Sequence, residues 1–203
     1  MKRIIAVATF VATVAAGTVT AATGAMTLAA PAASAAACPS GLTCGSYTIS
    51  GLGTRKQQVL QAGASVLDLA VAMLETDTMQ ANYTYGDGKT GDSANFGIFK
   101  QNWYMLRTSC GQFEGQSSSQ YNDGAALNSN LSEDVSCINQ SQSHYGLTDW
   151  FAGQRDGQSG LSNPNQSVIT EYVAGVDWIE SELNSSSANL SNDTRFWVEV
   201  PAI

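Results

Sequence analysis

The sequence predicts a mainly helical α+β fold with one small antiparallel β-hairpin or meander. Apolar residues recur at three- and four-residue intervals along much of the chain, which is typical of helices packed on a core. Between Thr76 and Phe99 this spacing disappears, and aromatic residues alternate with glycines and other turn formers. Apolar strands do not alternate with the helical segments, which disfavours a parallel α/β sheet.

The first 35 residues have the pattern of a secretory signal peptide. Lys2 and Arg3 precede an apolar stretch, and small residues then lead to Ala33-Ser34-Ala35, which suits cleavage by signal peptidase after Ala35. Cleavage after Ala37 is the alternative, because Ala35-Ala36-Ala37 follows the same rule. No segment approaches the ~20 unbroken apolar residues of a membrane span. We therefore expect a secreted, extracellular protein that has no membrane segment after cleavage.

Removal of this leader leaves about 168 residues, which is enough for one domain with a core and too few for two. We assign residues 36–53 to an N-terminal entry segment and residues 54–203 to the main domain. The formal charge of the full chain is -8, and loss of Lys2 and Arg3 makes it more negative. This charge disfavours nucleic acid and anionic lipid and favours a neutral partner. We expect a monomer.

The four cysteines all follow the leader and predict two disulfides in an exported protein. Three pairings are possible. We favour Cys38–Cys44, which closes a short loop of the entry segment, with Cys110–Cys137 joining two later helices. A zinc site is disfavoured because the sequence has no Cys-x-x-Cys pair and a single histidine, His144. We expect neither a metal nor an organic cofactor.

A central helix is expected from Thr54 to Glu75. Thr54 and Gln57 have the form of a capping box, and two adjoining apolar stripes follow them. A brief β-like patch at residues 47–49 precedes this helix. Helical spacing returns beyond the hairpin in four segments, 101–109, 125–139, 144–154 and 167–182. The polar segments 116–120 and 184–192 are expected to be surface loops.

Two carboxylates stand at either end of the segment that joins the central helix to the hairpin. Glu75 ends an apolar helix, so its carboxyl group can lie against hydrophobic surface, which raises its pKa toward that of a general acid. Asp87 lies in a glycine-flanked turn, Tyr85 to Lys89, that permits close approach to a ligand. Each alone has an ordinary explanation, as a solvated helix end and a turn residue. Together they supply the acid and the second carboxylate that glycoside hydrolysis requires.

The same region is rich in side chains that bind sugars. Aromatic rings stack on sugars, and amides form hydrogen bonds with their hydroxyl groups. These side chains are Tyr83, Tyr85, Asn95, Phe96, Gln101, Asn102, Trp103 and Tyr104. A calcium loop at Asp87 to Asp92 is disfavoured, because Lys89 and Gly91 stand where oxygen ligands are needed.

These residues resemble two families of carbohydrate-cleaving enzymes. A helix ending in Glu, a hairpin and the run from Asn95 to Asn102 are similar to the lysozyme pattern, but Asn95 stands where animal-type lysozymes keep their second catalytic carboxylate. From about Thr54 to the C-terminus, the chain more closely resembles the mannanases of glycoside hydrolase family 134. That resemblance rests on Leu74-Glu75-Thr76-Asp77, Tyr85-Gly86-Asp87-Gly88-Lys89, Asn95-Phe96-Gly97-Ile98 and Trp150-Phe151-Ala152-Gly153-Gln154-Arg155.

The second resemblance implies a lysozyme-like fold and internal cleavage of β-1,4-mannan with inversion of configuration. It makes Glu75 the general acid and Asp87 the base that activates water, with roughly 6.5–9.5 Å between the two carboxyl groups. Sugar-binding residues are then expected to be Lys89, Asn95, Phe96, Gln101, Trp103 and Arg155, with Phe96 and Trp103 shaping subsites. Arg155 either faces the cleft or forms a structural ion pair with Asp149 or Asp156.

Three other functions fit parts of the sequence. A lysozyme-like peptidoglycan hydrolase would act with Glu75 alone, although an acidic chain is poorly suited to an anionic cell wall. A non-catalytic carbohydrate-binding or inhibitor module would not need an acid at the end of an apolar helix. A serine esterase is disfavoured because Gly91-Asp92-Ser93 does not continue into a Gly-x-Ser-x-Gly motif.

Overall fold

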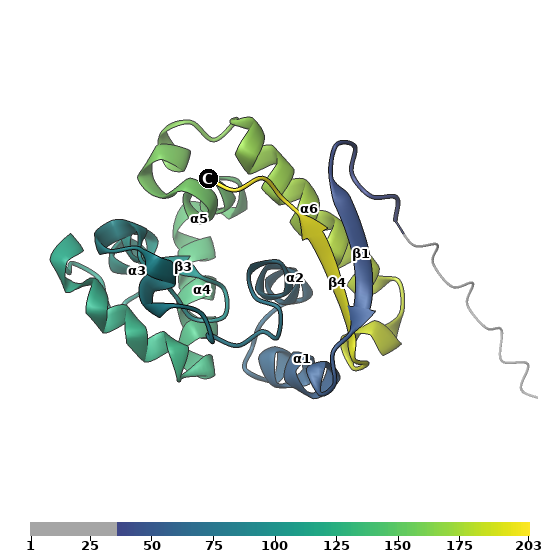
Figure 1. Ribbon diagram of the computed structural model, residues 1–203. Coiled ribbons are helices and arrows are strands. Elements are labelled where there is room, and N and C mark those ends of the chain that lie inside the picture. The colour runs from purple at the N-terminus through teal and green to yellow at the C-terminus, as the bar shows by residue number, and fades with distance from the viewer. Residues whose placement is uncertain (1–35) are drawn as a thin grey trace, which may run out of the picture. The chain divides into compact units, whose positions relative to one another are not determined.

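Helix α2 (Val66–Glu75) runs through the centre of the computed structural model, which describes residues 36–203 (Figure 1). Its residues from Asp68 to Met73 are all buried, as expected for a helix with two adjoining apolar stripes. Around α2 lie α1 (Leu52–Gln61), α6 (Ser167–Asn184) and β4 (Thr194–Glu199). The predicted signal peptide, residues 1–35, lies outside the described residues.

The expected single helix from Thr54 to Glu75 is wrong, because α1 and α2 are separate helices. Gly63 between them has a φ of 101°, a left-handed conformation that ends α1. Ser65 then begins α2 with a capping box: its side chain accepts from the Asp68 backbone, and the Asp68 side chain accepts from the Ser65 backbone. The expected end of the central helix at Glu75 is confirmed.

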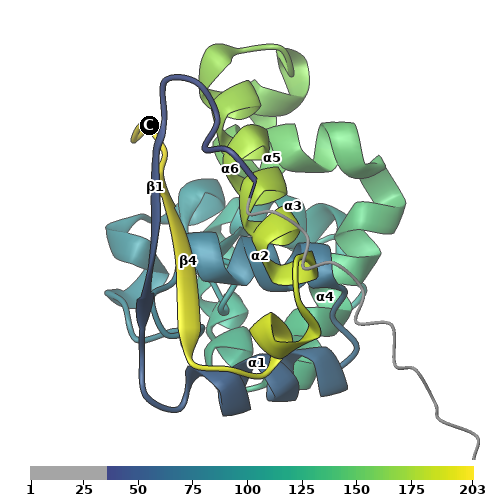
Figure 2. The same ribbon diagram turned by 90° about the vertical axis from the view of Figure 1, so that its right-hand side faces the viewer.

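The two ends of the described chain pair as an antiparallel ribbon (Figure 2). In this ribbon β1 (Thr43–Thr48) places Thr43 opposite Glu199 and Thr48 opposite Thr194 of β4. Phe196 and Val198 of β4 are buried in the main hydrophobic core. The sequence predicts a brief β-like patch at residues 47–49 but no strand near β4, because the pairing partners lie at opposite ends of the chain.

The expected small hairpin is confirmed at the end of the predicted segment. Strands β2 (Asn95–Phe96) and β3 (Gln101–Asn102) pair antiparallel, with Asn95 opposite Asn102 and Phe96 opposite Gln101. Before β2, the segment contains two 3-10 turns, η1 (Tyr85–Gly88) and η2 (Gly91–Ser93), instead of further strands. The mainly helical α+β class is therefore confirmed, with less β structure in this segment than a meander would have.

The remaining helices occupy the expected parts of the chain with shifted ends. They are α3 (Trp103–Ser109), η3 (Ser118–Asn128), α4 (Leu131–Tyr145), α5 (Leu147–Ser162) and η4 (Ser187–Leu190). Helix α4 begins later than expected because the Asn130 side chain caps it by accepting from the Glu133 backbone, and the residues before it form η3. The segments expected to be loops, 116–120 and 184–192, contain parts of η3 and η4.

Both favoured disulfides are present, Cys38–Cys44 at the start of β1 and Cys110–Cys137 between the end of α3 and α4. The second disulfide belongs to a small hydrophobic cluster with Phe96, Trp103 and Phe113, which is separate from the main core around α2. Within residues 36–203, no helix is long and apolar enough to cross a membrane.

The start of α2 gives a test of this arrangement. Asp68 is buried, and its carboxylate accepts hydrogen bonds from Ser65 and from Gln142 of α4. Asp68→Ala removes one half of the capping box and the acceptor of the Gln142 bond, which should destabilise the protein by about 2 kcal/mol. We expect Tm, measured by circular dichroism, to fall by about 4–8 °C. The same substitution at exposed Asp123 should leave Tm nearly unchanged, and equal shifts in both variants would contradict the assignment.

Candidate active site

Glu75 ends α2 and lines a pocket of about 440 Å³. The other residues that line this Glu75 pocket are Thr76, Asp77, Thr78, Gln80, Asn82, Tyr83 and Lys100. Burial raises the pKa of Glu75, while a hydrogen bond from Tyr172 and the charges of Lys100 and Arg155 act in the opposite direction. Burial has the largest effect, so the protonated form of this carboxyl group is favoured relative to a carboxyl group in water.

Tyr172 of α6 holds the Glu75 carboxyl group in place. Its hydroxyl group donates to Glu75 Oε1 at 2.7 Å, and its side chain is buried. Burial and the nearby Glu75 carboxylate raise the pKa of Tyr172 well above its usual value, so it remains a phenol and a donor. Because Oε1 receives this bond, Oε2 is the oxygen available to carry a proton toward a ligand.

Asp87 lies in the η1 turn, where the backbone is left-handed at three successive residues. The φ angles are 60° at Gly86, 59° at Asp87 and 73° at Gly88. Lys100 Nζ lies 3.1 Å from Asp87 Oδ1 and 3.2 Å from Oδ2, and Asn95 Nδ2 donates to Oδ2 at 3.2 Å. The turn therefore presents an Asp carboxylate with a fixed cation and a fixed amide donor.

Lys100 acts on both carboxylates, by an ion pair with Asp87 and by its charge near Glu75. It forms the ion pair with Asp87, lines the Glu75 pocket and lowers the pKa of Glu75. Its ammonium group also lies 5.0 Å from the centre of the Tyr83 ring, whose hydroxyl group donates to the Gly97 carbonyl. Lys100 lies in the turn between β2 and β3, and this turn places its ammonium group in the site.

A second pocket, of about 280 Å³, lies on the other side of the Asp87 contacts. This Arg155 pocket is lined by Lys89, Asn95, Tyr104 and Arg155, with further residues of η2 and α5. Asn95 lines the Arg155 pocket and Lys100 lines the Glu75 pocket, and both bind Asp87. Asp87 lines neither pocket itself, but it contacts one wall residue of each. Of the expected sugar-binding residues, Lys89 and Asn95 both line the Arg155 pocket.

Arg155 faces this pocket and forms no ion pair with Asp149 or Asp156 in the described part of the chain. Its guanidinium group lies 5.4 Å from the centre of the Tyr172 ring, and its Nη2 donates to the Pro201 carbonyl. Its Nε and the neighbouring Gln154 Oε1 are buried without a hydrogen-bond partner. Such unpaired atoms are uncommon in folded proteins and are often found where a ligand binds.

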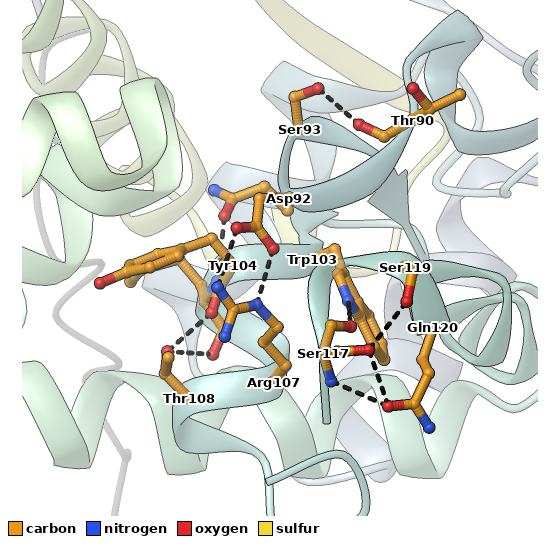
Figure 3. A network of polar contacts seen from close by, with 12 residues as sticks. Thr90, Asp92, Ser93, Trp103, Tyr104, Arg107, Thr108, Ser117, Ser119 and Gln120 are labelled. Carbon is orange, nitrogen blue, oxygen red and sulfur yellow. Dashed lines mark hydrogen bonds and ion pairs between the residues drawn. The ribbon is translucent and has the colours of Figure 1, made fainter. Parts of the chain in front are cut away.

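One wall of the Arg155 pocket is held by a network of polar contacts (Figure 3). Arg107 of α3 donates to both carboxylate oxygens of Asp92, at 2.6 and 2.8 Å, and this pairing lowers the pKa of Asp92. The Arg107 guanidinium group also lies 5.2 Å from the centre of the Tyr104 ring. The Arg107 contacts fix the position of η2 relative to α3. Because Asp92 and Tyr104 both line the pocket, these contacts also fix this part of its wall.

Three expected sugar-binding residues are buried and do not line either pocket. Phe96 and Trp103 are 0 % exposed and pack edge to face, and the Trp103 indole donates to the Ser117 carbonyl. Gln101 is 2 % exposed and donates to the Asp134 carboxylate. The expectation of a direct sugar contact is corrected for these residues, because Phe96 is fully buried and the polar groups of Trp103 and Gln101 are used inside the protein.

Lys100 and Tyr172 were not among the site residues expected from the sequence. Lys100 lies inside the run from Asn95 to Asn102, so its position in that motif was a usable signal. Tyr172 follows the apolar spacing of α6 and resembles an ordinary core residue. Its contact with Glu75 depends on the packing of α6 against α2, which local sequence does not reveal.

The chain matches a known protein family over most of its length. Residues 53–200 fit the profile of glycosyl hydrolase family 134. The matched range begins in α1, ends just after β4 and includes both Glu75 and Asp87. No curated protein sequence matches the chain significantly.

The Tyr172 contact predicts how Glu75 titrates. A hydrogen bond from Tyr172 stabilises the ionised carboxylate, so Tyr172→Phe should raise the pKa of Glu75 further. The ¹³C chemical shift of the labelled Glu75 carboxyl group measures this pKa directly. Tyr145→Phe is the matched control, because the Tyr145 hydroxyl group contacts Thr108 instead. A Glu75 pKa that stays constant or falls in Tyr172→Phe would show that the hydrogen bond is not formed in solution.

Proposed function

The chain belongs to glycosyl hydrolase family 134 and is therefore a glycoside hydrolase, and from this we propose that it cleaves β-1,4-mannan internally with inversion of configuration. The observation that carries the proposal is the difference between its two carboxylates. Burial raises the pKa of Glu75, whereas Asp87 is paired with a lysine and an amide. Glycoside hydrolysis by inversion uses one protonated and one ionised carboxyl group, which matches these two environments.

Glu75 acts in this proposal as the general acid. With Tyr172 donating to Oε1, the proton is carried on Oε2 and is transferred to the glycosidic oxygen as the bond from that oxygen to C1 breaks. The raised pKa of Glu75 keeps more of the acid protonated near neutral pH than an exposed glutamate would allow.

Asp87 acts as the general base. Its ionised carboxylate, oriented by Lys100 and Asn95, accepts a proton from a water molecule as the water oxygen bonds to C1 on the face opposite the leaving group. The configuration at C1 is thereby inverted. After product release, Asp87 loses this proton and Glu75 regains one, which restores both groups for the next cycle.

The shape and polarity of the site support a neutral polysaccharide as the substrate. Two pockets, each with a wall residue bound to Asp87, suit a chain of sugars that extends to both sides of the cleaved bond. Gln154 Oε1 and Arg155 Nε offer an acceptor and a donor, and one sugar hydroxyl group can satisfy either. Lys89, Asn95 and Arg155 are proposed to contact the sugars. An acidic chain is compatible with an uncharged mannan.

We also place this activity outside the cell, carried out by a monomer. The two disulfides support export, since such bonds persist in oxidising compartments. The predicted leader at residues 1–35 would direct this export.

The decisive test is release of reducing sugar from β-1,4-mannan by the mature protein, in parallel with lysis of bacterial cell walls. We expect activity on mannan and a loss of about 100-fold or more in both Glu75→Gln and Asp87→Asn, because each removes a proton-transfer group. Asp123→Asn, at an exposed residue of η3, is the control and should keep full activity. Lysis of cell walls that survives Asp87→Asn would identify a peptidoglycan hydrolase acting with Glu75 alone. No cleavage of either polymer would indicate a binding module.

The stereochemistry of the first product tests the role of Asp87 separately. Inversion predicts that ¹H NMR of a mannohexaose digest first shows the α-anomer of the new reducing end, followed by mutarotation. An initial β-anomer would mean retention, and Asp87 would then not act as a base toward water.

A further inference from the structure

Glu182, near the end of α6, is a buried carboxylate without a cationic side chain beside it. The residue is 6 % exposed, and none of the ion pairs within residues 36–203 includes it. Its Oε1 accepts a hydrogen bond from the backbone nitrogen of Ala36 at 2.7 Å. Burial of a carboxylate is costly unless a cation or several donors compensate for the lost water. The environment of Glu182 therefore lacks a positive charge that would stabilise it.

Ala36 is held at both of its backbone polar groups. Trp178 precedes Glu182 by one helical turn, and its indole nitrogen donates to the Ala36 carbonyl at 2.9 Å. The two side chains thus lie on one face of α6 and clamp a single residue between them. The distance from Ala36 N to Glu182 Oε1 is within the range of a bond between an ammonium group and a carboxylate.

The sequence predicts signal peptidase cleavage at the bond that precedes this clamped residue. Hydrolysis there breaks the bond between the Ala35 carbonyl carbon and the Ala36 nitrogen, and water supplies OH to the former and H to the latter. The new α-amino group then takes up a proton, because its ordinary pKa is about 7.7–8.0. Cleavage thus converts an amide with one N–H into an ammonium group with three.

We propose that Glu182 and Trp178 form a receptor for the N-terminus created by cleavage after Ala35. The α-ammonium group of Ala36 supplies the positive charge that Glu182 lacks, and the pair fastens the entry segment to α6. Cleavage after Ala37 would remove Ala36 and leave both receptor side chains without these partners. The receptor therefore fits a chain processed after Ala35, not one processed after Ala37, and makes the processed chain more stable than its precursor.

This inference rests on the predicted signal peptide and does not depend on the proposed mannanase activity. Its first test is the intact mass and N-terminal sequence of the protein secreted from its full-length precursor. We expect the secreted chain to begin at Ala36. A chain that begins at Cys38 would overturn the proposal.

The second test separates a charge pair from an ordinary amide contact. Mature chains that begin at Ala36 or at Ala35 are prepared from fusions that leave no extra residue, each with and without Glu182→Gln. The extra residue restores the amide at Ala36 and moves the ammonium group away. We expect the Ala36 chain to have the higher Tm, by about 3 °C or more, and Glu182→Gln to abolish most of this difference.

Asp177→Asn, at an exposed carboxylate of the same helix, is the matched control. It should not lower Tm appreciably in the Ala36 chain or in the Ala35 chain. If the Ala36 and Ala35 chains have the same Tm, or if Glu182→Gln lowers both by the same amount, the ammonium group contributes nothing and the proposal is wrong. Activity on mannan is not a readout of either test, so failure here and failure of the proposed function are distinguishable.

Discussion

The ion pair between Asp87 and Lys100 is the contact on which the site depends. Both residues have left-handed backbone conformations, with φ angles of 59° and 47°, which cost roughly 1–3 kcal/mol each for residues other than glycine. Such strain persists where the surrounding structure fixes it. Here the η1 turn fixes one partner and the turn between β2 and β3 fixes the other, so their charges meet at the wall of the Glu75 pocket that Lys100 forms.

The hairpin that carries Lys100 is in turn anchored to α4 by a buried carboxylate. Asp134 accepts hydrogen bonds from the Ile98 backbone and from the Gln101 side chain, each at 2.7 Å. Burial raises the pKa of Asp134 to about 7, while these two bonds act in the opposite direction. Gly97 makes the close approach possible, because a Cβ atom at this position would collide with the Asp134 carboxylate. Helix α4 thus holds the hairpin in place, and the hairpin in turn holds Lys100 against Asp87.

Glu75 receives its environment from a different part of the fold. Helix α6 packs along α2, which brings Tyr172 to the Glu75 carboxyl group, and α5 packs against α6, which places Arg155 over the Tyr172 ring. The ribbon of β1 and β4 covers the same helices and buries Phe196 beside them. Two carboxylates close in sequence thus acquire different environments, because one is controlled by the helical core and the other by the hairpin. That division is the physical basis for assigning them different roles.

Local pattern was enough to predict the mainly helical class, the end of a buried helix at Glu75, the glycine-flanked turn at Asp87 and both disulfide pairings. The sequence analysis does not predict the break before Ser65, because the apolar stripes continue across it; Gly63 and the cap with Asp68 separate the helices. Tertiary structure decided the pairing of β1 with β4, the contact of Tyr172 with Glu75 and the burial of Gln101 and Trp103. Periodicity reports which face of an element is apolar, but it does not report which distant element covers that face. An amide or an indole looks the same in sequence whether it meets a sugar or a backbone carbonyl.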